Sequence, residues 1–123
     1  MFHELAFQIA KKAQSKQVDK AGKDYILHPM KVASYMDTDT EKAVAYLHDV
    51  LEDTNVTEDE LRNMFPNEIV DTVIILTHRK DESYFEYISR VSTSKLAKKI
   101  KVADLLHNLD ITRIKEPTKQ DYQ

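Results

Sequence analysis

This sequence contains very few of the residues that end helices and form tight turns. Glycine occurs once, at Gly22, and proline three times in 123 residues, while 32% of the residues are charged and 41% are hydrophobic. The chain is therefore rich in helix formers and poor in turn residues. We expect an all-α fold, a bundle of about six or seven helices in which residues 1–123 form a single domain.

Apolar residues at helical spacing and capping patterns place these helices along the chain. Thr57 with Glu60, and Ser83 with Glu86, form the capping-box pattern that precedes a helix. Pro66 opens a segment that is apolar in nearly every direction, so we expect it to be the central helix. The predicted helices are residues 2–18, one entered through His28 and Pro29, one from Asp39 or Thr40 to Glu52, a short one after Thr57, one from Pro66 to 76, one after Ser83, and one from Thr93 or Ser94 to 114.

Charge and cysteine content limit the partners of the chain. A net charge of −3 and a pI near 5.9 give no overall attraction to nucleic acid or to an anionic membrane. The absence of cysteine excludes disulfides, thiolate metal sites and a cysteine nucleophile, and suits a reducing compartment. No apolar run approaches the roughly 20 residues of a membrane span, and the first residues lack a secretion signal. We expect a cytoplasmic protein without nucleic-acid or membrane partners; its oligomeric state is not set by the sequence.

Polar residues inside one apolar segment point to a function. Residues 43–54 read Ala-Val-Ala-Tyr-Leu-His-Asp-Val-Leu-Glu-Asp-Thr, so His48 and Asp49 lie in a stretch that should be buried. A buried imidazole beside carboxylates costs several kcal/mol unless charge or hydrogen bonds compensate it, and a bound cation is the simplest compensation. On one continuous helix, His48 would share a face with Glu52, and Asp49 with Asp53. We expect all four side chains to converge on one cavity.

The same conflict recurs near the end of the chain. Asp104 interrupts a second apolar segment, and Asn108 lies one turn later on the same helical face. With His28 from a helix entrance, Asp104 would complete a ring of two imidazoles and two carboxylates. Nitrogen and oxygen ligands without sulfur suit Mn²⁺, Fe²⁺ or Zn²⁺ better than Ca²⁺, and open positions would remain for water and substrate.

Three motifs in this order resemble a known family. They are residues 25–29 (Tyr-Ile-Leu-His-Pro), 48–54 (His-Asp-Val-Leu-Glu-Asp-Thr) and 101–108 (Lys-Val-Ala-Asp-Leu-Leu-His-Asn). Over about residues 11–113 the chain resembles the HD-superfamily metal-dependent phosphohydrolases, and within them the alarmone hydrolases related to the (p)ppGpp hydrolase domain of the Rel/SpoT enzymes.

The resemblance implies an activity, a metal and a role for each site residue. The implied reaction removes the 3′-pyrophosphate from guanosine tetra- or pentaphosphate as an intact diphosphate and leaves GDP or GTP. The implied cofactor is one Mn²⁺ ion, with other divalent transition metals as alternatives. The implied metal ligands are His28, His48, Asp49 and Asp104; Glu52 and Asp53 serve the attacking water; Asn108 and Lys20 contact the substrate. Because the polyphosphate needs further positive charge, we also assign Arg79 to the substrate, with Lys23 and Lys80 as other candidates in loops.

The sequence also departs from the family pattern. Asp19 stands where the larger enzymes usually carry an arginine against the nucleobase, and Asp24 stands where they usually have a proline. The small alarmone hydrolases continue into another helix beyond the position of Gln123, so either the sequence is truncated at its C-terminus or its substrate contacts differ. How the base is recognised is therefore not predicted.

Other functions stay open on the sequence alone. The same metal ring would activate water toward another phosphate ester, such as a nucleoside monophosphate or a nicotinamide dinucleotide phosphate. A non-catalytic module that binds an alarmone or a protein, and a purely structural bundle, are the further alternatives. No attached synthetase is expected. Three histidines, His3, His78 and His107, have no evident partner, and we assign them no place in the site.

Overall fold

The described part of the structure is built from helices alone. The computed structural model describes residues 1–14 and 26–114, with side chains up to residue 109, and these ranges contain no strand. The all-α fold expected from the sequence is thus confirmed. The helices are α1 (Phe2–Ala13), α2 (Leu27–Ser34), α3 (Asp39–Leu47), α4 (Val50–Asp53), α5 (Glu58–Met64), α6 (Asn67–Leu76), α7 (Tyr84–Val91) and α8 (Lys95–Ile114).

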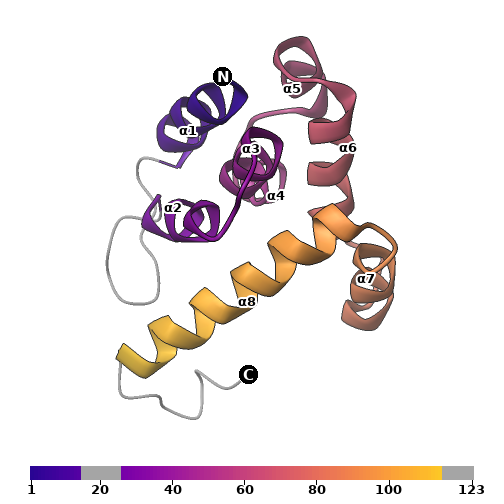
Figure 1. Cartoon of the computed structure of the whole chain (residues 1–123). Helices are drawn as coiled ribbons and strands as arrows, with labels where there is room; N and C mark the ends of the chain where they lie inside the picture. The colour runs from indigo at the N-terminus through magenta and orange to yellow at the C-terminus, as the bar shows by residue number, and fades with distance from the viewer. Residues whose placement is uncertain (15–25, 115–123) are drawn as a thin grey trace.

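The helix at the centre is α3. It packs against α1, α2, α6 and α8, and Figure 1 shows these four arranged around it. Its apolar side chains Val44 and Leu47 are fully buried, and each such burial contributes about 1.5–3 kcal/mol. The prediction that the helix after Pro66 is central was wrong. Ile74 and Ile75 of α6 are only partly buried, and α6 packs against one side of α3.

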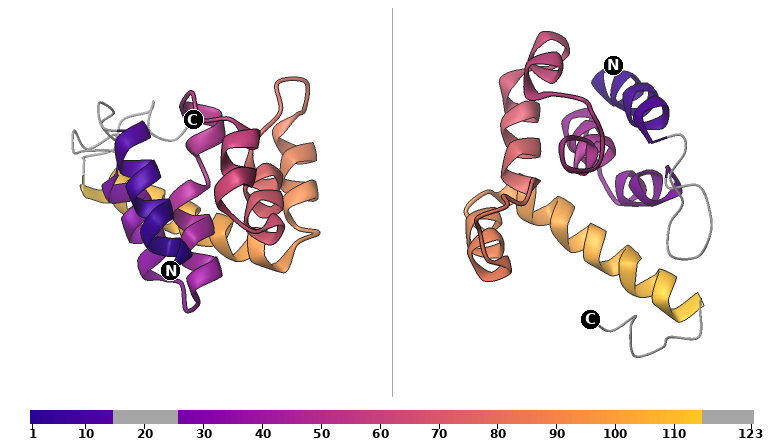
Figure 2. Two further views of the ribbon diagram at one scale, coloured as in Figure 1. Left: turned by 90° about the horizontal axis from the view of Figure 1, so that it is seen from above. Right: turned by 180° about the vertical axis from the view of Figure 1, so that it is seen from behind.

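Helix α8 spans one side of the bundle. It begins beside α7, runs past α6 and α3, and reaches α2, and the right-hand view in Figure 2 shows it uncovered along its length. Ser94 caps it, because its hydroxyl accepts a hydrogen bond from the backbone N–H of Ala97 at 3.1 Å, which agrees with the predicted start. This course carries residues from the second half of the chain to α2 and α3.

Most predicted helix starts are confirmed, and the start of α3 is corrected. Both predicted capping boxes, at Thr57 and Ser83, are formed. Helix α3, however, is capped by Thr38, whose hydroxyl accepts the backbone N–H of Glu41 while the Glu41 carboxylate accepts that of Thr38. The neighbouring Asp39, one of the two predicted caps, instead accepts the backbone N–H of His3 at 2.9 Å and so ties α1 to α3.

Two predicted helices end earlier than expected. The first ends at Ala13, and its predicted residues 15–18 lie outside the described residues. The third stops at Leu47, and a turn at His48 and Asp49 separates it from α4. The His48 ring donates from Nδ1 to the Ala45 carbonyl at 2.6 Å and competes with the backbone for that acceptor. The single helix expected to reach Glu52 is therefore divided at the His-Asp pair.

No helix within the described ranges is long and apolar enough to cross a lipid bilayer.

Candidate metal centre

Four side chains from three separate stretches of the chain meet inside the bundle. His28 comes from the first turn of α2, His48 and Asp49 from the turn between α3 and α4, and Asp104 from α8. One ligand atom from each lies within 4.8 Å of the others. His28, His48 and Asp104 are buried and Asp49 is partly exposed, so the group is largely shielded from solvent and most accessible at Asp49.

His48 is held with one ring nitrogen, Nε2, facing the cluster. Its Nδ1–H donates to the backbone of Ala45, which leaves the lone pair of the neutral ring on Nε2. That Nε2 lies 3.1 Å from Asp49 Oδ2 and 3.4 Å from Asp104 Oδ1. Burial alone would lower the pKa of His48, but the charges and hydrogen bonds of Asp49 and Asp104 raise it well above its usual value.

Asp104 uses its two oxygens for different partners. Oδ1 lies 2.6 Å from His28 Nε2 and faces the cluster, while Oδ2 accepts a hydrogen bond from Lys101 Nζ at 3.0 Å. Burial alone would raise the pKa of Asp104, but hydrogen bonds from His28 and His48 and the charge of Lys101 hold it far below its usual range. This carboxylate is therefore ionised at neutral pH.

Lys101 is a cation in direct contact with the cluster, through Asp104. Its side chain is only 18% exposed, and its ammonium lies 5.2 Å from the centroid of the buried Tyr87 ring. Burial alone would lower the pKa of Lys101, but the charge of Asp104 raises it above its usual value. Lys101 thus stays charged and holds Asp104 in one orientation.

Glu52 follows Asp49 by three residues on α4 and is anchored to a different loop. Its Oε1 accepts the backbone N–H of His78 at 2.9 Å, which joins α4 to the loop after α6. That loop is itself fixed by Arg90, which pairs with Glu82 at 2.7 Å and donates to the Thr77 carbonyl at 3.1 Å. The hydrogen bond from Arg90 lowers the pKa of Glu82 to about 2. Glu52 is therefore held in position at a solvent-exposed edge.

The remaining predicted site residues are exposed or lie outside the described residues. Asp53 is exposed at the end of α4, and Asn108 is exposed one turn beyond Asp104 on α8. Arg79 is exposed, and its backbone N–H donates to Glu82 at 3.1 Å. No contact given for the described residues joins its side chain to the cluster. Lys20, Lys23, Asp19 and Asp24 lie outside the described residues.

The structure adds two histidines that the sequence interpretation left without partners. His107 Nδ1 lies 2.7 Å from Nδ1 of the cluster residue His28. The backbone of His78 holds Glu52, and its ring lies 4.8 Å from the Tyr87 ring. A helical spacing of three from Asp104 is the signal that would have placed His107 on the same face. His3, in contrast, pairs with Asp39 at the far end of α3.

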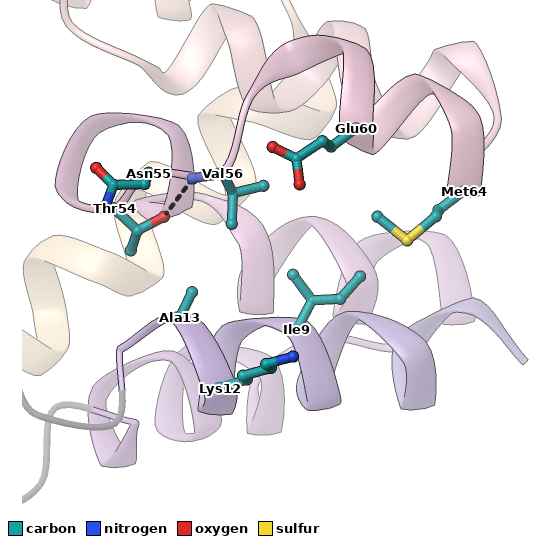
Figure 3. A pocket seen from close by; sticks show the side chains of 8 residues that line it. All are labelled: Ile9, Lys12, Ala13, Thr54, Asn55, Val56, Glu60 and Met64. Carbon is teal, nitrogen blue, oxygen red and sulfur yellow. Dashed lines mark hydrogen bonds between the residues drawn. The ribbon is translucent and has the colours of Figure 1, made fainter.

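A hollow elsewhere on the surface lacks this chemistry. It has a volume of about 440 Å³ and lies between α1 and the segment from Thr54 to α5, as Figure 3 shows. Its walls include the apolar side chains of Ile9, Val56 and Met64, and none of the four clustered residues lines it. The polar cluster, rather than this hollow, concentrates the reactive groups.

The donor set suits a divalent metal. Two imidazole nitrogens and two carboxylate oxygens, three of them on buried residues, form a compact set that binds transition metals. The hydrogen bond at the second nitrogen of His48 is the feature that typically orients a metal-binding imidazole. The cluster could therefore hold one divalent ion.

Comparison with known proteins identifies the family. The HD domain profile matches residues 6–105, a range that contains all four clustered residues, and the chain belongs to the HD domain family. A probable GTP pyrophosphokinase of Mycobacterium leprae is 33% identical over 129 residues, which cover 94% of this chain and 16% of that protein. A guanosine-3′,5′-bis(diphosphate) 3′-pyrophosphohydrolase of Borreliella burgdorferi is 32% identical over 132 residues, or 94% of this chain and 20% of that protein. The chain thus spans a fifth or less of the length of these relatives.

A solved structure is similar over almost the whole chain. It is a metazoan ortholog of SpoT that hydrolyzes ppGpp and plays a role in starvation responses. The superposition has a TM-score of 0.79 at 25% sequence identity and covers 95% of this chain and 73% of the other. The arrangement of helices is therefore that of a known hydrolase.

Proposed function

We propose that this domain is a metal-dependent hydrolase that removes the 3′-pyrophosphate from guanosine tetra- or pentaphosphate, giving GDP or GTP and pyrophosphate. The observation that carries the proposal is the meeting of His28, His48, Asp49 and Asp104, with their ligand atoms within 4.8 Å of one another. The substrate is supported by the relatives named as ppGpp 3′-pyrophosphohydrolases and by the ppGpp-hydrolyzing structural neighbour.

The four clustered residues would hold one ion, and we propose Mn²⁺ because the set mixes nitrogen and oxygen donors without sulfur. A divalent cation held there would supply Lewis acidity, which makes water a better nucleophile near neutral pH and polarises a phosphoryl group. Asp104 would offer Oδ1 to the ion, since Lys101 occupies Oδ2. The buried ammonium also offsets part of the negative charge that the carboxylates bring.

Glu52 is the residue we assign to receive the proton of the attacking water. His78 holds its Oε1, so the second carboxylate oxygen is the one that accepts the proton. Asp53, the next residue, supports the same water. The water oxygen forms a bond to the phosphorus attached to the 3′ oxygen, and the bond between this phosphorus and the 3′ oxygen breaks. The 3′ oxygen takes up a proton and becomes the 3′-hydroxyl of GDP or GTP.

Residues around the rim would bind the rest of the substrate. Asn108 exposes its amide one turn from Asp104 and would hydrogen-bond the ribose or a phosphate. Lys20 and Arg79 stay our candidates for the phosphate charges. That the chain forms a single domain and acts in the cytoplasm are also predictions.

A turnover assay tests the proposal. Purified protein with Mn²⁺ and ppGpp should release pyrophosphate, and Glu52→Gln should lower kcat by about a hundredfold to ten-thousandfold while leaving Mn²⁺ affinity unchanged. Glu58→Gln is the matched control, because Glu58 is an exposed glutamate that pairs with Arg62 on α5. It should leave both quantities unchanged.

The other outcomes separate the rival functions. Release of phosphate from other nucleotides, but no pyrophosphate from ppGpp, would replace the proposed substrate with another phosphate ester. Tight binding of ppGpp at saturating Mn²⁺ without turnover would indicate a binding module. Equal activity of Glu52→Gln and the wild type would remove Glu52 from the reaction.

A further inference from the structure

His28 is held at both ring nitrogens by residues of a single helix. Its Nε2 lies 2.6 Å from Asp104 Oδ1, and its Nδ1 lies 2.7 Å from His107 Nδ1. Asp104 and His107 are three residues apart on α8 and so project from the same face. The His28 ring, which projects from α2, thus contacts α8 through both of its nitrogens.

The contact between the two rings is close and well aligned. Their planes are 14° from parallel, and their centroids are 4.9 Å apart. His28 is buried and His107 is half-buried, so the contact lies at the inner edge of the site. Because each neutral imidazole has one donor and one acceptor nitrogen, two Nδ1 atoms at this distance share one proton.

The chemistry of a metal ligand fixes which ring donates. If His28 binds an ion through Nε2, its proton must be on Nδ1, and a partner must accept that proton there. The same requirement is met for His48 by the carbonyl of Ala45. For His28 the structure offers His107 Nδ1 at this position.

We propose that His107 is a positioning residue of the metal centre, which accepts the Nδ1–H of His28 and so presents His28 Nε2 to the ion. The inference rests on the proposed function only in requiring that the four clustered residues bind a divalent cation. A carbonyl can only accept a proton, whereas an imidazole can accept or donate. His107 therefore stabilises the His28 ring both with its proton on Nε2, facing Asp104, and with its proton on Nδ1.

The experiment measures Mn²⁺ affinity, independently of any substrate. His107→Phe keeps a planar ring but removes the acceptor, and we expect it to weaken Mn²⁺ binding about 10–100-fold, the usual loss for such a partner. His107→Asn places an amide oxygen near the position of Nδ1 and should keep affinity close to that of the wild type. If His107→Phe loses its helical circular dichroism, His107→Ala takes its place.

His3→Phe is the matched control. His3 is also a half-buried histidine hydrogen-bonded to another side chain, but its partner is Asp39, away from the cluster. We expect unchanged Mn²⁺ affinity for this variant, and the pattern of loss in His107→Phe, rescue in His107→Asn and no effect in His3→Phe supports the proposal.

Each other pattern overturns it. If His107→Phe binds Mn²⁺ as tightly as the wild type, His28 needs no hydrogen-bond acceptor at Nδ1. If His107→Phe and His107→Asn lose equal Mn²⁺ affinity, the loss does not come from removing a hydrogen-bond acceptor. Equal losses in His107→Phe and His3→Phe indicate general destabilisation. If the wild type binds no divalent metal, this inference and the proposed metal-dependent function fail together, whereas tight binding by the wild type and His107→Phe alike overturns this inference alone.

Discussion

Replacing Asp104 with alanine should destabilise the metal-free protein strongly. Asp104 accepts hydrogen bonds from Lys101 at 3.0 Å and from His28 at 2.6 Å, and both side chains of the Lys101 pair are largely buried, at 18% and 7% exposure. Removing one partner of a buried ion pair leaves the other charge without compensation and costs about 3–5 kcal/mol. Total stability is roughly 5–15 kcal/mol, so the loss is a large part of it.

The loss is measurable by urea unfolding in EDTA and by thermal melting. A chain of this length has an unfolding entropy of about 0.26 kcal/mol/K, so the expected decrease in Tm is about 12–20 °C. Asp37→Ala is the matched control, because Asp37 pairs with Lys99 at 2.8 Å but is 81% exposed. An exposed pair contributes little, so this variant should melt close to the wild type.

A second substitution tests the cause. If the unpaired Lys101 ammonium is responsible, Lys101→Met added to Asp104→Ala should recover part of the lost stability, since the buried charge is then removed. A loss below about 1 kcal/mol for Asp104→Ala, or a loss equal to that of Asp37→Ala, would refute the reasoning. It would mean that Asp104 is not held by the buried contacts described above.

Three further predictions concern the metal, pH and the wall of the site. Mn²⁺ at a hundredfold excess over its Kd should stabilise the protein by about 2.7 kcal/mol, seen as an EDTA-reversible increase in Tm, and an unchanged Tm would contradict a metal site. Because the folded pKa of His48 is raised, its contribution to metal-free stability is complete below about pH 6.5 and is lost as the pH rises through the folded pKa. Urea titrations of wild type and His48→Gln in EDTA should converge with rising pH, and divergence would show the wrong sign. Tyr87→Phe removes the hydrogen bond that the phenol donates to the Leu76 carbonyl at 2.7 Å, and should cost about 1 kcal/mol in urea unfolding; an unchanged midpoint would exclude this role.

Local signals in the sequence predicted much of the fold. A capping box needs only residues three positions apart, so Thr57 with Glu60 and Ser83 with Glu86 could be identified without the tertiary structure. Thr38 with Glu41 has the same pattern and was missed because Asp39 and Thr40 are also good caps by residue type. The structure decides between them, since Asp39 is used by the N-terminal end of α1.

Contacts between distant residues explain what the sequence did not reveal about the site. Asp104 was recognisable because a carboxylate in an apolar run requires a partner, whichever partner it is. His107 had only its spacing of three from Asp104 as a signal, because its partner His28 is 79 positions away and two of its neighbours on α8, Leu106 and Asn108, are exposed. Arg79 was assigned to the substrate only because it is positively charged and lies in a loop. No contact of the described residues tests this assignment, which stays a prediction.

The break between α3 and α4 explains how two adjacent residues serve one cluster. On a continuous helix, neighbouring side chains point about 100° apart, so His48 and Asp49 would diverge. The hydrogen bond from His48 Nδ1 to Ala45 coincides with the end of α3, and past that point Asp49 Oδ2 lies 3.1 Å from His48 Nε2. The same bond places the remaining lone pair of His48 on the nitrogen that faces Asp104. One local contact therefore accounts for both the interrupted helix and the orientation of the imidazole, and the helical periodicity that predicted a buried segment was unable to predict where that segment bends.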